Sequence, residues 1–226
     1  MMLLVGLSLA APLTVGERLE WAVSWMGIEA GTAWSTVSQQ DGRWVVEAGA
    51  RNAGWLDNLY PIDDWMRSTW RDVGSERYET RFREGRFHQD QDMRLGPPEI
   101  QVSRGQNNGD QGWHTWDSHY RYVPLAEDPI SAVFRLRVSP PPVGGAVEIP
   151  VFNGKKTLSL RATGAVGEAV DGTPTREVTV RSAGDGDYEG AVTILLSEDA
   201  DRVPLRVYVS TRAGPVIVAL RKRTLP

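Results

Sequence analysis

The chain of 226 residues contains no cysteine and only three histidines. The absence of cysteine excludes disulfides, thiol nucleophiles, zinc–thiolate sites, iron–sulfur clusters and a lipid anchor attached through a cysteine. The sequence also lacks a Gly-x-Ser-x-Gly nucleophile elbow, a Gly-x-Gly-x-x-Gly loop and a Walker lysine. No catalytic motif therefore names a reaction, and we expect neither a metal nor another cofactor.

The chain also lacks any concentration of positive charge. It carries 25 Lys and Arg against 29 Asp and Glu, and the two signs are mixed along its length. The basic footprint of a nucleic-acid-binding protein is therefore missing, and we expect no nucleic-acid partner. No segment has the roughly 20 consecutive apolar residues that a transmembrane helix needs.

One shorter apolar run stands at the start of the chain, at Met1–Ala11. It has the length of a signal-peptide core, and Ser8-Leu9-Ala10 provides small residues at the two positions that signal peptidase reads. The usual basic segment before the core is missing, so a buried first strand is the alternative. We expect residues 1–11 to be a signal segment and the mature chain to be periplasmic or secreted in a bacterium.

The dominant period in the remaining sequence is two. Leu19, Trp21, Val23 and Trp25 fall on one face of a predicted strand, with polar residues on the other. Further strands are predicted at 30–38, 44–51, 62–72, 77–87, 113–123, 147–152, 157–163, 176–182, 192–197, 205–211 and 216–221. We expect a short helical turn at 54–60 and a loop, ending a hairpin, at 96–112.

The best helix signal follows Asp128, which is a suitable N-cap, with Pro129 at the first helical position and apolar residues at helical spacing to Val138. The prediction is an all-β, mainly antiparallel protein, either a curved sheet, a sandwich or a half-open barrel, with one short helix. Residues 12–226 form a single β-rich domain in this interpretation, with sub-lobes at 12–125 and 145–226 joined by the helix at 128–138.

Several short segments resemble, in their order, the bacterial family catalogued as domain of unknown function 3108. They are Gly16–Trp21, Trp25–Ala33, Tyr60–Asp64, Arg83–Gly85, Asp128–Ser131, Phe134–Arg137 and Asp201–Leu205. The resemblance implies an exported, β-rich protein without an established activity. It assigns no catalytic residue.

All nine tryptophans lie between Trp21 and Trp116. Trp21, Trp25 and Trp44 share apolar faces and are expected in the core. The candidate ligand-binding residues are indoles among polar neighbours, together with nearby arginines that bind phosphate or carboxylate bidentately; they are Trp34, Trp65, Trp70, Arg67, Arg81 and Arg83. The alternative is that arginines stack on these indoles and simply cover the outer face.

The candidate catalytic groups are three carboxylates and one histidine. Asp63 and Asp64 point to opposite faces of a strand, so only one of them would pair with Glu84 from a neighbouring strand. His114 lies close in sequence to Asp117. The alternative for Asp63 or Asp64 is a turn with an ion pair to an arginine.

The sequence does not favour either of two possible metal sites. His88, His114 and His119 would have to converge from different faces to hold a metal. Gly184-Asp185-Gly186-Asp187 has the composition of a calcium loop but not its ligand spacing.

The favoured function is non-covalent binding of an amphipathic envelope ligand, which would be a lipid, a glycan or a peptide segment. An acyl-chain site requires an apolar interior, whereas a sugar platform requires exposed indoles beside Asp and Arg. The polar neighbours of Trp34 favour the platform. The alternatives are an envelope hydrolase that uses a carboxylate pair, and a structural or assembly factor whose exposed apolar patch contacts a protein partner.

Overall fold

The computed structural model describes residues 13–58, 60–183, 190–211 and 214–226. The first eight strands are β1 (Arg18–Trp25), β2 (Ile28–Gln40), β3 (Arg43–Asn52), β4 (Asp63–Arg71), β5 (Gly74–Glu84), β6 (Phe87–Arg94), β7 (Glu99–Asn108) and β8 (His114–Arg121). The other six are β9 (Ala146–Phe152), β10 (Thr157–Val166), β11 (Thr175–Ser182), β12 (Val192–Ser197), β13 (Pro204–Thr211) and β14 (Gly214–Thr224). Two helices, α1 (Gly54–Asp57) and α2 (Pro129–Val138), accompany them.

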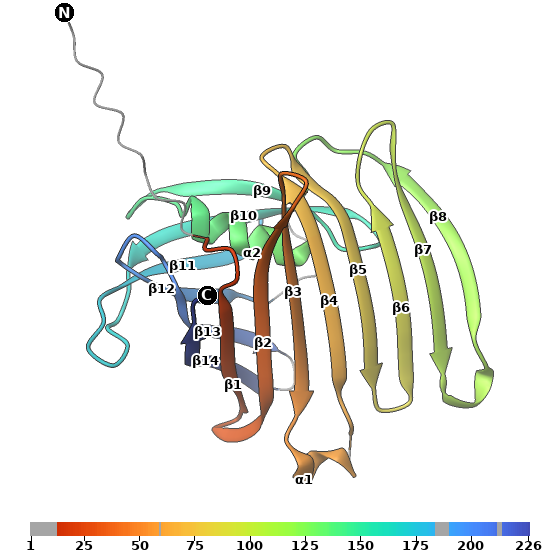
Figure 1. The fold of residues 1–226 in the computed structure, drawn as a ribbon, viewed down its shortest axis with the longest axis horizontal. Coiled ribbons are helices and arrows are strands. Elements are labelled where there is room, and N and C mark those ends of the chain that lie inside the picture. The colour runs from red at the N-terminus through yellow and green to blue at the C-terminus, as the bar shows by residue number, and fades with distance from the viewer. Residues whose placement is uncertain (1–12, 59, 184–189, 212–213) are drawn as a thin grey trace, which may run out of the picture.

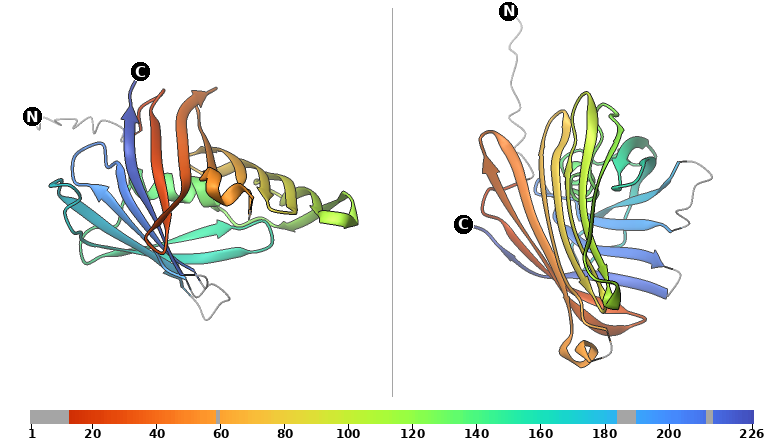
Figure 2. Two further views of the ribbon diagram at one scale, coloured as in Figure 1. Left: turned by 90° about the horizontal axis from the view of Figure 1, so that it is seen from below. Right: turned by 90° about the vertical axis from the view of Figure 1, so that its right-hand side faces the viewer.

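The strands form one antiparallel sheet in the order β8-β7-β6-β5-β4-β3-β2-β1-β14-β13-β12-β11-β10-β9. β1 pairs with β14, so strands from the two ends of the chain meet in the middle of the sheet. The sheet curls around α2, while its edge strands β8 and β9 are not paired with each other (Figures 1 and 2). The predicted all-β, antiparallel and curved architecture is confirmed.

α2 begins where the sequence predicts. Asp128 Oδ1 accepts hydrogen bonds from the backbone N–H groups of Ile130 and Ser131 at 2.8 and 2.9 Å, and the backbone N–H of Asp128 donates to Ser131 Oγ at 2.9 Å. This reciprocal arrangement is a capping box, with Pro129 at the first position. No helix in the described part of the chain has the length and apolarity needed to cross a bilayer.

α2 also organises the core. Ala132 and Leu136 pack against β9–β12, while Phe134 packs in a second cluster with Trp70 and Val46. Ile130 contacts this second cluster and a third one that contains Met93. A helix turns through all directions within 3.6 residues, so one helix inside a curved sheet serves several walls at once. The short α2 therefore holds the inner faces of both halves of the sheet together.

The prediction of a loop at 96–112 is wrong. The strand predicted at 77–87 is present as β5, which begins three residues earlier, at Gly74, and ends before the predicted limit. β5 ends at Glu84, a turn at Gly85 follows, and β6 and β7 form a hairpin. The inward alternation of β7 is limited to Ile100 and Val102, followed by Arg104, and the Gln-Asn-Asn-Gly segment has the composition of a turn. Pairing with β6 and β8 on both sides supplies the backbone hydrogen bonds that composition did not predict.

Trp25 is also not where its pattern predicts. It is 40% exposed because β1 ends there, before Met26 and Gly27, which both have positive φ. The helical turn predicted at 54–60 is confirmed as α1. The proposed signal segment at 1–11 and the Gly184–Asp187 segment lie outside the described residues.

Candidate functional site

The interior of the curved sheet contains an apolar cavity of about 300 Å³ beneath α2. Ligand pockets in proteins are typically about 300–1,000 Å³ and mainly apolar, with few polar groups. The lining side chains come from α2 and from both halves of the sheet, and include Trp21, Ala33, Ser35, Ala48, Ala50, Met66, Ile130, Val133, Phe134, Arg137, Leu196, Val207 and Val218. Val133 is 36% exposed, so the cavity is not sealed from solvent.

Small side chains on neighbouring strands create this space. Trp21 faces Ala33, which faces Ala50, in one row across β1, β2 and β3. In the next row Ser35 faces Ala48. Protein interiors are otherwise packed to the density of organic crystals, so a run of alanines opposite a helix leaves a gap that the neighbouring residues do not fill.

The wall of the cavity carries one polar atom without a partner. Ser35 is 3% exposed, and its Oγ forms no hydrogen bond with any described residue. A buried hydroxyl without a partner costs about 1–3 kcal/mol, so such groups usually bind water or a ligand. Arg137, the other polar lining residue, is already held by Glu17 at 2.5 and 3.0 Å.

A buried carboxylate fixes the start of α2 against the sheet. Asp128 Oδ2 accepts hydrogen bonds from Ser68 Oγ on β4 at 2.5 Å and from Ser75 Oγ on β5 at 2.6 Å. Burial raises the pKa of Asp128, and the bonds from Ser68 and Ser75 oppose that rise. These contacts set the position of the helix that forms one wall of the cavity.

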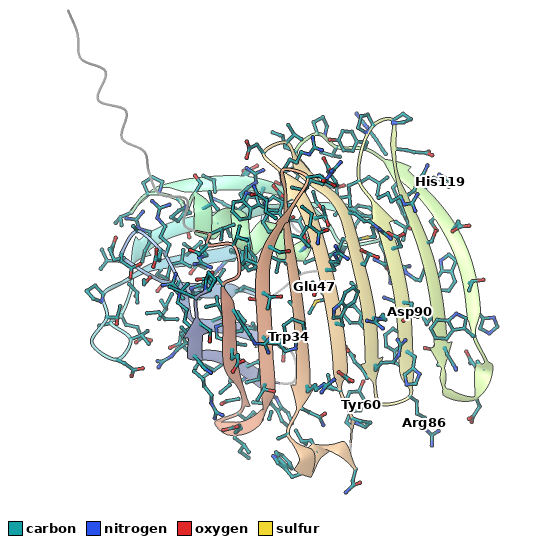
Figure 3. The ribbon with its side chains drawn as sticks, in the orientation of Figure 1. Trp34, Glu47, Tyr60, Arg86, Asp90 and His119 are labelled. Atoms are coloured by element: carbon teal, nitrogen blue, oxygen red, sulfur yellow. The ribbon has the colours of Figure 1, made fainter. Side chains whose placement is uncertain are left out.

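The outer face of the sheet carries most of the predicted ligand-binding residues. Trp34, Gly49, Trp65 and Arg81 face one another in a row across β2, β3, β4 and β5. The guanidinium of Arg18 stacks over Trp34 at 5.1 Å, and that of Arg81 over Trp65 at 4.7 Å. The predicted stacking of arginine on outer-face indoles is therefore present. Figure 3 labels Trp34 on β2, Glu47 on β3 and Asp90 on β6.

Three of these residues adjoin a trough of about 630 Å³ on the outer face of β4–β8. Trp65 and Arg81 line it, and Arg83 lies beside it, in an ion pair with Asp90 of 2.7 Å. Arg67 lies next along the face and donates to Gln40 Oε1 at 3.0 Å. Of the predicted ligand-binding residues, Trp65, Arg81 and Arg83 therefore lie together at one surface.

Trp70 does not join this surface. It is 5% exposed and packs against Phe134 of α2, with ring centroids 5.9 Å apart. Trp65 and Trp70 differ in parity along β4, and Trp70 shares the inner face with Met66 and Ser68. The polar neighbours of Trp70 in sequence include Ser68, which is itself buried against Asp128.

The candidate catalytic groups fall into separate places. Asp63 is exposed and pairs with Arg51 at 2.8 Å, which is the ion pair expected for a turn residue. Asp64 and Glu84 are in hydrogen-bond contact through their carboxyl groups. This contact is closer than the roughly 5 Å separation of a retaining glycosidase pair. His114 bonds to the carbonyl of Gln111 at 2.9 Å and lies three strands from Glu84, about 14 Å at ordinary strand spacing.

The Asp64–Glu84 pair is half-buried on the inner side of the sheet. Burial raises the pKa of Asp64, and the backbone N–H of Arg83, which donates to Asp64 Oδ1 at 2.9 Å, opposes this. Burial, and then the negative charge of Asp64, raises the pKa of Glu84. Glu84 is therefore the member of the pair that keeps its proton longer as the pH rises.

The described residues contain no group of three or more His, Asp or Glu side chains placed to hold a metal ion. Exposed apolar side chains gather near α1 and the β1–β2 turn, where Trp25, Met26, Ile28 and Trp55 are each at least 40% exposed. Trp55 Nε1 donates to the carbonyl of Glu29 at 3.2 Å, which ties α1 to β2.

Sequence reasoning missed the interior cavity. The signal for it was the small size of Ala33, Ser35, Ala48 and Ala50 at positions of core-facing parity, where larger apolar residues are expected. That signal has meaning only once the three strands are aligned, because one alanine in a strand is ordinary.

The fold defines an unclosed, β-barrel-like protein that surrounds a helix and an apolar cavity. The chain belongs to the family described as "Protein of unknown function (DUF3108)", whose model matches residues 20–221. No curated protein matches the chain.

Two solved structures align with most of the chain. The "Beta-barrel-like Protein of Domain of Unknown Function DUF1849 from Brucella abortus" aligns with a TM-score of 0.62 at 9% identity, over 95% of this chain and 99% of that one. The "hypothetical protein CT021 from Chlamydia trachomatis" aligns with a TM-score of 0.41 at 10% identity, over 92% and 87% of the two chains. At this identity the first likeness concerns the fold alone.

Proposed function

We propose that the protein binds an amphipathic ligand without altering it chemically, and that the hydrocarbon part of the ligand occupies the interior cavity. The observation that carries the proposal is the apolar cavity of about 300 Å³ between α2 and the alanine-lined wall of the sheet. Apolar surface removed from water contributes about 25 cal/mol per Å² to binding. A hydrocarbon chain gains this without leaving polar groups unpaired.

Ser35 supplies the polar element of this interaction. Its hydroxyl donates to an oxygen of the ligand, such as the carbonyl of an ester or a carboxylate, and so gains the hydrogen bond that it lacks within the described residues. A lipid or fatty acid combines both features. A glycan has no long apolar segment and does not match a cavity of this lining.

The geometry favours binding over hydrolysis. Asp64 and Glu84 contact each other directly and His114 lies on a distant strand, so a nucleophile, a base and an orienting group do not converge. We place this binding in the bacterial envelope, on the basis of the apolar N-terminal run and the absence of cysteine.

The test is a titration of the full-length and signal-free chains with cis-parinaric acid, a fluorescent fatty acid, in parallel with Ala50→Phe. The added ring fills the cavity from the sheet side, and we expect the affinity to fall about tenfold or more, equivalent to about 1.4 kcal/mol. Val166→Phe adds the same ring at a position that is 74% exposed and serves as the control.

If Ala50→Phe unfolds cooperatively and binds cis-parinaric acid with unchanged affinity, the ligand does not occupy the cavity and the proposal is wrong. Native mass spectrometry of the purified protein gives an independent measurement. The proposal is supported if the purified protein carries a bound ligand that dissociates in organic solvent, and if a smaller fraction of Ala50→Phe carries it.

A further inference from the structure

The outer-face trough is a second, separate place for a ligand. Successive side chains on a strand point to opposite faces, so the trough on β4–β8 and the interior cavity lie on opposite sides of the sheet. Its volume, about 630 Å³, lies in the range of ligand pockets. Nothing in the cavity proposal requires it.

The floor of the trough is a register row. Trp65, Arg81, Asp90, Gly105 and Thr115 face one another across β4, β5, β6, β7 and β8. A parallel row of Glu79, Asp92, Ser103 and Asp117 lies beside it. At about 4.8 Å per strand, the rows give a polar surface about 19 Å across.

Indoles stand at both sides of this floor. Trp65 stands at the β4 side. The indole of Trp113 packs against Gly105 of β7, where an added Cβ would come within 2.6 Å of the indole Nε1. Only glycine at this position leaves room for the ring against the backbone. Trp113 is 45% exposed, and the guanidinium of Arg83 lies 6.0 Å from its ring.

The polar groups between the indoles are partly paired. Asp90 is paired with Arg83 at 2.7 Å, and Asp92 with Arg77 at 2.9 Å. Within the described part of the chain, Arg81 makes no hydrogen bond or ion pair besides its stacking on Trp65, and Asp117 makes none. The trough therefore offers free donors on β5 and free acceptors on β8.

We infer that this trough binds an uncharged oligosaccharide. The apolar C–H face of a sugar ring packs against an indole, while its hydroxyls donate to Asp117 and accept from Arg81. Carboxylates line the trough at four positions, Glu79, Asp90, Asp92 and Asp117, and guanidinium groups at two, Arg81 and Arg104, so the lining does not favour a polyanion. The polar floor disfavours a hydrocarbon chain.

The test is isothermal titration calorimetry of the full chain with three neutral oligosaccharides, chitotetraose, maltotetraose and cellotetraose, and with an oligogalacturonate as the anionic comparison. We expect saturable binding of at least one neutral sugar and weaker binding of the oligogalacturonate. Trp113→Ala and Gly105→Ala are each expected to weaken neutral-sugar binding about tenfold or more, with cis-parinaric acid binding unchanged.

Two matched variants serve as controls. Gly96→Ala adds a methyl group where no atom lies within 4 Å, and Trp55→Ala removes an indole that is 58% exposed on α1. Both are expected to bind sugar as the unmodified chain does. The inference is overturned if none of the three neutral sugars binds saturably, or if folded Trp113→Ala and Gly105→Ala bind as tightly as the controls. Tighter binding of the oligogalacturonate also overturns it.

Discussion

Arg137 of α2 and Glu17, just before β1, form a bidentate ion pair of 2.5 and 3.0 Å with side chains that are 1% and 0% exposed. Arg137 Nε also donates to the carbonyl of Asp201, at 3.0 Å. Glu17 Oε1 also accepts a hydrogen bond from Arg223 Nε of β14, at 2.7 Å. The pair therefore joins the cavity helix to the segments before β1 and in β14. Arg137 and Glu17 are 120 residues apart in sequence.

The two members of this pair are not equivalent, and their replacement should show it. Glu17→Leu leaves the buried Arg137 charge without a carboxylate, and we expect a loss of about 3–5 kcal/mol in the free energy of unfolding. Arg137→Met leaves Glu17 paired with Arg223, so a smaller loss is expected. Urea unfolding measures both. An equal loss in the two variants would show that Arg223 does not compensate.

Ser35→Ala should separate stability from binding. Removal of a buried hydroxyl without a partner is expected to raise the free energy of unfolding of the ligand-free protein by about 1 kcal/mol. The same change should weaken cis-parinaric acid, which has a carboxylate, more than a plain alkane probe. Ser38→Ala, whose hydroxyl donates to the carbonyl of Val45 at 3.5 Å, is the control on the same strand. A less stable Ser35→Ala protein would mean that the hydroxyl already has a partner.

The Asp64–Glu84 pair predicts a pH dependence of stability. Because both folded-state pKa values are raised, the folded protein binds the protons more tightly than the unfolded chain. The contribution of the pair is fully present below the ordinary values of 3.8 and 4.5, and is lost as the pH rises through the raised pKa values. Stability should therefore fall with rising pH in this window.

Glu84→Gln tests this dependence, because the amide still donates to Asp64 but does not titrate. Buried Asp128 and Glu127, whose pKa values burial also raises, contribute the same sign. The difference between the original chain and Glu84→Gln isolates the pair. Urea unfolding across the acid range should give a shallower slope of stability against pH for Glu84→Gln than for the original chain. Parallel slopes for the two proteins would show that the pair does not contribute to the pH dependence.

The export proposal predicts a processed N-terminus. When the chain is expressed in a Gram-negative host, the periplasmic fraction should contain protein that begins at Ala11 or Pro12, at the end of the proposed signal segment. N-terminal sequencing or intact mass gives the answer. Replacement of Ala10 by a large residue should retain the precursor. Full-length protein confined to the cytoplasm would contradict export.

Much of the fold was predictable because its causes are local. Alternation in β1 is visible in four consecutive odd positions, and the Asp128-Pro129 start of α2 depends on residues that are adjacent in sequence. The sequence did not predict the β6–β7 hairpin, because both strands carry polar residues on the inner face as well as on the outer face, which hides the alternation. For Gln91 and Arg104 the inward position is polar because the two side chains bond to each other, at 2.6 and 2.8 Å.

The candidate sites were less predictable because they depend on contacts between distant strands. Trp65 and Trp70 have similar neighbours in sequence, yet one lines the outer trough and the other packs under α2. The sequence shows that the two indoles lie close along one strand. It does not show which face the helix covers, since that depends on where Asp128 meets Ser68 and Ser75.

The sequence by itself determined the β class, the single cap-defined helix and the family, because strand period, capping and turn chemistry act within a few residues. Only the tertiary structure decided the cavity and the trough. Each is a space between residues of several strands, and its size depends on the register that brings Ala33 opposite Ala50 and Asp90 opposite Gly105. Register follows from the packing of whole faces, which no local pattern contains.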